Sequence, residues 1–186
     1  METKVLYKAD KFDVIEADGF SGIAPTDIYI AVLPFERGVD GLPSLIGVID
    51  EYNPMRRGSK SLTAITGVAV GDDPDVLSSA KKKLVEEAGY DAVDTSRWTY
   101  LGEMTTNKFV MDSLHCFAVD VTGLRRKPEP EGDGTLQSDK SEFKFLSVQD
   151  ALNVEDCYIP AIFMRCFKYV FSNEMKDKKE DNKEEE

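Results

Sequence analysis

The sequence predicts an α+β domain in which a mixed β-sheet lies between helices. Three observations predict it: short apolar runs rich in β-branched residues, an amphipathic helical pattern in mid-chain, and a second series of strands that ends in another helical pattern. The order strands, helix, strands, helix is typical of a sheet covered by helices. With 186 residues, 41% of them hydrophobic, the chain has the length and composition of one domain with a core.

Four strand regions are expected before the first helix: Lys4–Ala17 (one strand, or two broken near Asp10), Asp27–Phe35, Leu45–Tyr52 and Ser61–Val70. The turn-rich segment Glu36–Pro43 predicts a hairpin with a loop longer than two residues. Met55–Lys60 is a basic connector. Gly67, inside the fourth strand, marks a bulge or a close backbone approach.

The clearest element is a helix over residues Pro74–Ala88. Asp73 is a good N-cap, Pro74 suits the first helical position, and Gly89 supplies a left-handed stop. One apolar stripe follows at helical spacing: Leu77, Ala80, Leu84 and Ala88.

The second half of the chain repeats the alternation of strands and a helix. The expected elements are strands at Arg97–Met104, Ser113–Val121 and Glu142–Val148 (an edge strand), a short helix at Gln149–Leu152, and an amphipathic helix at Ile159–Phe171. The polar segment Leu124–Lys140 is long enough to suggest a functional loop. We therefore predict a single domain over residues 1–173, with strands 4–17 as a dimerisation or substrate subdomain, and a disordered charged tail over residues 174–186.

Composition excludes several function classes. The formal net charge is −12, and so acidic a surface repels phosphate backbones, which argues against a nucleic-acid binder. No apolar run approaches the roughly 18 residues of a membrane span, and the first residues lack the apolar stretch of a signal peptide, so we expect a soluble, cytoplasmic protein. The three cysteines, Cys116, Cys157 and Cys166, are widely spaced and predict small buried side chains in a reducing compartment.

A metal site would have to be built from carboxylates, because His115 is the single histidine of the sequence. Carboxylates select hard ions such as Mg²⁺ or Mn²⁺. The helix carries two adjacent acids, Glu86 and Glu87, near its C-terminus, preceded by Lys82 and Lys83. A solvated face with salt bridges is the simplest interpretation. However, acids at a helix C-terminus oppose the macrodipole, which a divalent cation would compensate.

The segment from Gly67 to Tyr90, GVAVGDDPDVLSSAKKKLVEEAGY, resembles the Nudix box, G-x5-E-x7-R-E-U-x-E-E-x-G-U, where U is aliphatic. Its C-terminal half matches at Leu84, Glu86, Glu87 and Gly89, with Tyr90 at the last apolar place, and Gly67 fits the first of the two glycines that open the box in many members. The departures are Val68 for the second glycine, Pro74 for the early glutamate, and Lys82 and Lys83 for the Arg-Glu pair. Asp72 and Asp73 lie near the missing glutamate.

The resemblance extends over about Asp27 to Phe171 and is closest to the ADP-ribose pyrophosphatases. The segment Val48–Pro54, with Asn53 in place of an arginine, is similar to the one that precedes the box in that branch, and Thr63 falls at a glutamate position. The resemblance implies a Nudix-like α/β/α sandwich and magnesium-dependent hydrolysis of a nucleoside diphosphate derivative such as ADP-ribose. It also makes a homodimer through the N-terminal strands plausible.

Residue roles follow from the same resemblance. Glu86 and Glu87 would be catalytic metal ligands for Mg²⁺ or Mn²⁺, and a further acid would come from Glu142 or from the preceding loop (Glu129, Glu131, Asp133 or Asp139). The candidate substrate-binding residues are Arg56, Arg57, Lys82, Lys83 and Gly67. Tyr52, Trp98 and Phe109 would stack on a base or lie in the core.

Two function classes remain open. One is a metal-dependent pyrophosphohydrolase of full or reduced activity. The other is a catalytically inactive module that binds a nucleotide or a protein partner, with Lys83 in place of the metal. In such a module, the Lys83 ammonium group would supply the positive charge that holds a phosphate.

Overall fold

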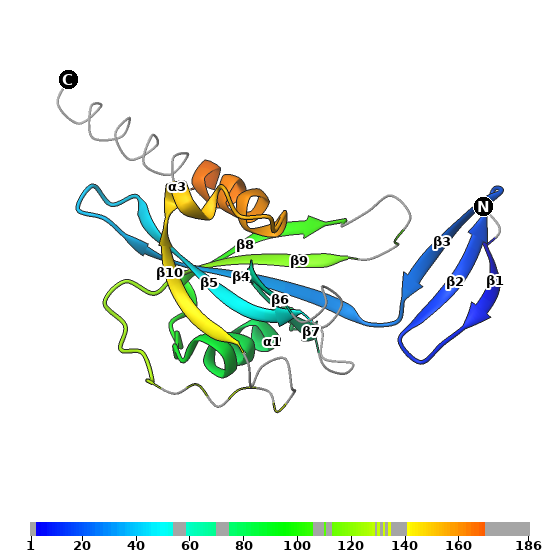
Figure 1. The fold of residues 1–186 in the computed structure, drawn as a ribbon, viewed down its shortest axis with the longest axis horizontal. Helices are drawn as coiled ribbons and strands as arrows, with labels where there is room; N and C mark the ends of the chain where they lie inside the picture. Colours follow the sequence, from blue (N-terminus) through cyan, green and yellow to red (C-terminus); the bar gives the residue numbers. More distant parts are fainter. Residues whose placement is uncertain are drawn as a thin grey trace, which may run out of the picture.

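The computed structural model describes residues 3–53, 59–69, 75–105, 110, 113–128, 130, 132, 134 and 141–169. Its main sheet has the order β10–β5–β4–β9–β8, with β6 paired to β5 and β7 to β4 (Figure 1). The bounds of these strands are β4 Ile28–Arg37, β5 Pro43–Asn53, β6 Ser59–Thr63, β7 Ile65–Ala69, β8 Trp98–Met104, β9 Leu114–Asp120 and β10 Glu142–Ser147. β4 and β9 are parallel and the other pairs are antiparallel, so the predicted mixed sheet is confirmed.

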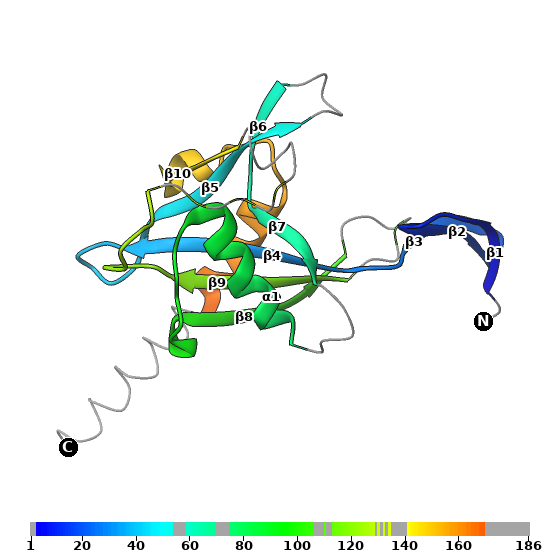
Figure 2. The ribbon, with the colours of Figure 1, turned by 90° about the horizontal axis from the view of Figure 1, so that it is seen from below.

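Alternation along the central strands buries both faces of this sheet. On β4, Ile30 and Val32 face one hydrophobic cluster, whereas Ala31 and Leu33 face the other. The first cluster is covered by α1 (Val76–Lys83) and the following turn η2 (Leu84–Ala88). The second is covered by α3 (Val148–Ala151) and a helix over residues 158–169, on the opposite side of the sheet (Figures 1 and 2). The predicted α+β sandwich is therefore confirmed.

The N-terminal residues form a second, three-stranded antiparallel sheet that projects from the body (Figures 1 and 2). The predicted strand Lys4–Ala17 is a pair, β1 (Thr3–Lys8) and β2 (Phe12–Ala17). A third strand, β3 (Phe20–Pro25), was not expected, because Gly19, Gly22 and Pro25 weaken the strand signal. Its turn places Asp18 and Gly19 at positive φ.

Two further expectations need correction. The predicted strand Ser61–Val70 is interrupted at Ala64, so that β6 pairs with β5 and β7 with β4. The N-cap of α1 is Asp75, whose carboxylate accepts a hydrogen bond from the Leu77 N–H at 3.1 Å. Asp73 was therefore the wrong cap. Asp73 and Pro74, the predicted tail and most of the 129–140 loop lie outside the described residues.

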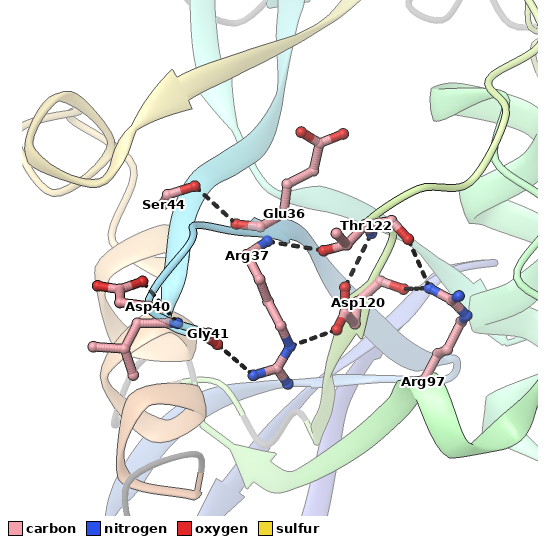
Figure 3. Close-up of polar contacts among 9 residues, drawn as sticks. Glu36, Arg37, Asp40, Gly41, Ser44, Arg97, Asp120 and Thr122 are labelled. Atoms are coloured by element: carbon pink, nitrogen blue, oxygen red, sulfur yellow. Dashed lines mark hydrogen bonds and ion pairs between the residues drawn. The ribbon is translucent and has the colours of Figure 1, made fainter.

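The end of the sheet where β4 turns into β5 is held by a polar clamp (Figure 3). The Arg37 guanidinium donates to Asp120 Oδ2 and to the Gly41 carbonyl, both at 2.6 Å. The Arg37 N–H donates to Thr122 Oγ1 at 2.8 Å. From η3 (Thr95–Arg97), Arg97 donates to the carbonyls of Asp120 and Thr122. One hydrogen-bonded group thus joins the β4–β5 loop, the end of β9 and the start of β8.

Candidate functional site

The two predicted acids lie on η2, a π-helical turn that continues α1 and ends at Gly89. Leu84 and Ala88 are fully buried against the sheet, which fixes the orientation of the turn. The side chains of Glu86 and Glu87 are only 18% and 16% exposed. Gly89 has φ 74°, so the predicted left-handed stop is confirmed. Single π-helical turns occur frequently at functional sites.

Lys83 lies between the two carboxylates. Its Nζ is 3.1 Å from Glu86 Oε2 and 3.7 Å from Glu87 Oε1, and its side chain is 15% exposed. Lys82 contacts the other oxygen of Glu86 at 3.6 Å, but its side chain is 68% exposed. Glu86 Oε2 is buried, and no described residue hydrogen-bonds to it, so its contact with Lys83 is an ion pair without hydrogen-bond geometry. Two acids and two lysines therefore form one compact charge cluster.

Gly67 of β7 makes room for the Lys83 side chain. A Cβ added at Gly67 would lie 2.8 Å from Lys83 Cε and 2.9 Å from Cγ. Real Cβ atoms do not approach side chains so closely, so the lysine stem passes directly over the glycine backbone. Of the two alternatives predicted at Gly67, a bulge or a close backbone approach, the structure shows a close approach, in which the Lys83 side chain lies on the glycine backbone.

The segment after β9 forms a strap across the end of the η2 turn. Arg126 Nε donates to the Ala88 carbonyl, the Lys127 N–H to the Gly89 carbonyl and the Gly132 N–H to the Glu86 carbonyl, each at 2.9 Å. The Arg126 guanidinium also lies 4.9 Å from the centroid of the Phe143 ring. These donors satisfy carbonyls that a helix end leaves free, and the arginine compensates the negative end of the helix dipole.

The strap residues were missed in the sequence. The sequence feature that could have indicated them is the basic run Arg125–Lys127, because positive side chains are favoured near a helix C-terminus. Nothing in the run itself shows which helix end it meets.

The other predicted site residues are not gathered at this turn. Glu142 is exposed at the start of β10, and its neighbour Phe143 packs toward the buried Tyr90, so alternation directs Glu142 to the opposite face. Thr63 donates to Asp156 Oδ2 at 2.8 Å. Trp98 lies in the core and donates its indole N–H to the Ala92 carbonyl, whereas Tyr52 is half-buried at the end of β5. The candidates Arg56, Arg57, Phe109, Asp72, Glu129, Glu131, Asp133 and Asp139 lie outside the described residues.

His115 and the cysteines lie apart from the charge cluster. His115 stacks on Tyr100 and shares a hydrogen bond with its hydroxyl at 3.0 Å. Burial raises the pKa of the Cys116 and Cys166 thiols to about 11, so both remain protonated at neutral pH, as small buried side chains do. Cys157 is exposed, so the prediction of burial was wrong there because the residue precedes the final helix in a surface loop.

A hollow of about 580 Å³ lies on the other side of the sheet, between β8 and the 158–169 helix. Its polar lining comes from Glu103, Thr105, Ser113, Tyr158 and Arg165. Arg165 already donates to the carbonyls of Leu101 and Glu103, and the Ser113 hydroxyl donates to the Glu103 carboxylate. Much of this polarity therefore serves internal contacts.

Comparisons with known proteins bear on the fold of this chain. No family model and no curated protein matches the sequence. Among solved structures, an ADP compounds hydrolase shares the fold with a TM-score of 0.60 and 14% identity, and the match covers 93% of this chain and 94% of that chain. The Nudix-like fold is therefore supported. At this identity the likeness is one of fold, and it leaves the match to the Nudix box as a sequence-based expectation.

The resemblance to the Nudix box implies a divalent ion, but the described residues at η2 do not fit one. The space between Glu86 and Glu87 holds the Lys83 ammonium group, and a cation there repels a second cation. Among the residues that the structure describes, no group of three or more His, Cys, Asp or Glu side chains is placed to hold a metal. No helix in this part of the chain is long and apolar enough to cross a membrane.

Proposed function

We propose that this protein is a Nudix-type hydrolase that acts slowly on a nucleoside diphosphate derivative such as ADP-ribose. The observation that carries the proposal is the fold, which is shared over nearly the full length of both chains with an ADP compounds hydrolase. The partly buried pair of Glu86 and Glu87 supports it, because both side chains meet at one cation on one turn.

The chemistry available at the turn is that of acids and lysines. A carboxylate of the pair can accept the proton of a water molecule as the water oxygen bonds to phosphorus and the phosphoanhydride P–O bond breaks. Lys82 and Lys83 can neutralise the phosphate oxygens. Lysine charge stabilises the leaving phosphate less well than a coordinated ion, so the rate should be low. The resemblance to the Nudix box predicts magnesium, but the Lys83 ammonium group lies beside both described acids, so we propose hydrolysis without a metal ion at this turn. Asp72 and the loop acids lie outside the described residues.

The first test is an assay for AMP formation from ADP-ribose, with magnesium in one arm and EDTA in the other. We expect E86Q/E87Q to lower the rate about 100-fold, the order of magnitude that a general base contributes. The control is Glu155→Gln, an exposed acid before the last helix, which should leave the rate unchanged. Equal rates in the double variant and the wild type would contradict a role for the pair.

A non-catalytic module that binds a nucleotide or a protein partner is the second candidate, favoured by the ion pairs of Lys83 with both acids. The two candidates differ in one result. Absence of turnover across a panel of nucleoside diphosphate derivatives, with calorimetric binding of at least one of them intact, would establish binding and exclude hydrolysis.

The N-terminal sheet supports a proposed homodimer. Its exposed apolar residues are Val5, Leu6, Tyr7, Phe12, Phe20 and Ile23, and Ile15 is its buried hydrophobic residue. A small sheet that buries so little of its own surface gains stability when it packs against another. We expect light scattering after gel filtration to give the mass of two chains, and Phe20→Ser (Phe20 is 74% exposed) to shift it toward one. A wild-type mass of one chain at all concentrations would refute the dimer.

A further inference from the structure

We infer that the ammonium group of Lys83 is the resident cation of the η2 turn and takes the place there of a divalent metal ion. The inference deepens the proposed function and rests on the same site. Its first support is position: Nζ lies within ion-pair distance of one oxygen of each carboxylate, 3.1 Å from Glu86 and 3.7 Å from Glu87.

The second support is packing, which holds the lysine where it is. The Lys83 side chain is 15% exposed, and its methylene groups lie on the backbone of Gly67. Leu84 and Ala88, both fully buried, fix the turn on either side of the acids. The strap bonds from Arg126 and Gly132 hold the Ala88 and Glu86 carbonyls. Lys83 is therefore placed by the core and the strap, and not by solvent-exposed ion pairing alone.

The third support is the charge of the cluster. Among the described residues, Glu86 and Glu87 contribute two negative charges and Lys82 and Lys83 two positive charges, so these four side chains carry no net charge. A hard divalent ion binds where carboxylates leave a net negative charge, and it takes oxygen ligands at about 2.1–2.6 Å. An ion within that distance of both acids would lie beside the Lys83 ammonium group. The lysine must leave before a metal can bind.

The test compares two substitutions that remove the same charge from different places. Lys83→Met removes the buried cation, whereas Lys82→Met removes the exposed one, 68% exposed and bound to a single acid. Thermal unfolding is followed with and without Mn²⁺. We expect Mn²⁺, at a concentration about ten times its Kd, to raise the Tm of Lys83→Met by about 4 °C. The wild type and Lys82→Met should show no saturable rise.

Two further measurements keep the inference falsifiable if Lys83→Met folds poorly. Electron paramagnetic resonance counts bound Mn²⁺ on the wild type directly, and Lys83→Glu adds a ligand as well as removing the cation. Saturable Mn²⁺ binding to the wild type that is abolished in E86Q/E87Q would overturn the inference, as would absence of binding in a folded Lys83→Glu variant. Calorimetry with ADP-ribose tests the proposed function separately, because the failure of nucleotide binding leaves the Mn²⁺ result unaffected.

Discussion

Gly89→Ala is expected to lower the free energy of unfolding by about 3 kcal/mol. Two terms add. At φ 74° an L-residue pays about 1–2 kcal/mol for the left-handed conformation. The new Cβ would also lie 2.7 Å from the Lys127 carbonyl oxygen, which is backbone and held by the strap. The strap or the η2 turn must therefore shift.

Gly123→Ala separates the two terms. Gly123 has φ 72°, nearly the same conformation, but a Cβ there meets nothing within 4 Å. We expect a loss of about 1 kcal/mol, from the backbone alone. Urea unfolding monitored by Trp98 fluorescence gives both values. Equal losses in the two variants would mean that the strap does not press on Gly89.

Gly89→Ala should also disturb the charge cluster, because the strap holds the carbonyls on either side of Glu87. If the strap moves, Glu86 and Glu87 lose their fixed relation to Lys83. We therefore expect the nucleotide affinity of Gly89→Ala to fall while that of Gly123→Ala is retained. The left-handed glycine is thus both a helix stop and the contact surface for the strap.

The elements that sequence could predict are those with local causes. The stop at Gly89 follows from a glycine placed after an apolar stripe, and the two-sided burial of β4 follows from its continuous apolar run. The pairing of Lys82 with Glu86 follows from helical spacing.

The features that sequence could not predict depend on contacts between distant segments. The π-helical form of the turn is fixed by burial of Leu84 and Ala88 against the sheet. The contacts of Lys83 with Glu86 and Glu87 are themselves local, because helical spacing brings such residues together. The division of the predicted strand at Ala64 depends on pairing with two different strands. The strap from Arg126 crosses 38 positions of sequence to reach Ala88. The local sequence pattern does not show which distant segment a strand or loop will contact.

Arg37→Met is expected to lower the free energy of unfolding by about 2–3 kcal/mol, because it removes a charge-assisted bond to Asp120 and a bond to the Gly41 carbonyl (Figure 3). The Asp120 side chain is 18% exposed, so water replaces the lost donor poorly. Lys144→Met is the matched control: its bond to Asp50 is equally short, at 2.7 Å, but the lysine has no second partner among the contacts of the described residues. A loss of under about 1 kcal/mol is expected there.

The clamp also makes stability depend on pH in a defined direction. Burial alone would raise the pKa of Asp120, but hydrogen bonds from Thr122 and Arg37, and the charge of Arg37, outweigh burial and hold this pKa below 3.8. A carboxyl whose folded pKa is lowered stabilises the fold above its unfolded pKa, and this contribution is lost as the pH falls through the folded pKa. The wild type should therefore exceed Asp120→Asn in stability above about pH 5, and the difference should shrink as the pH falls below 3.8. A difference that stays constant between pH 7 and pH 3 would show that the ionised carboxylate is not what joins the β4–β5 loop to the end of β9.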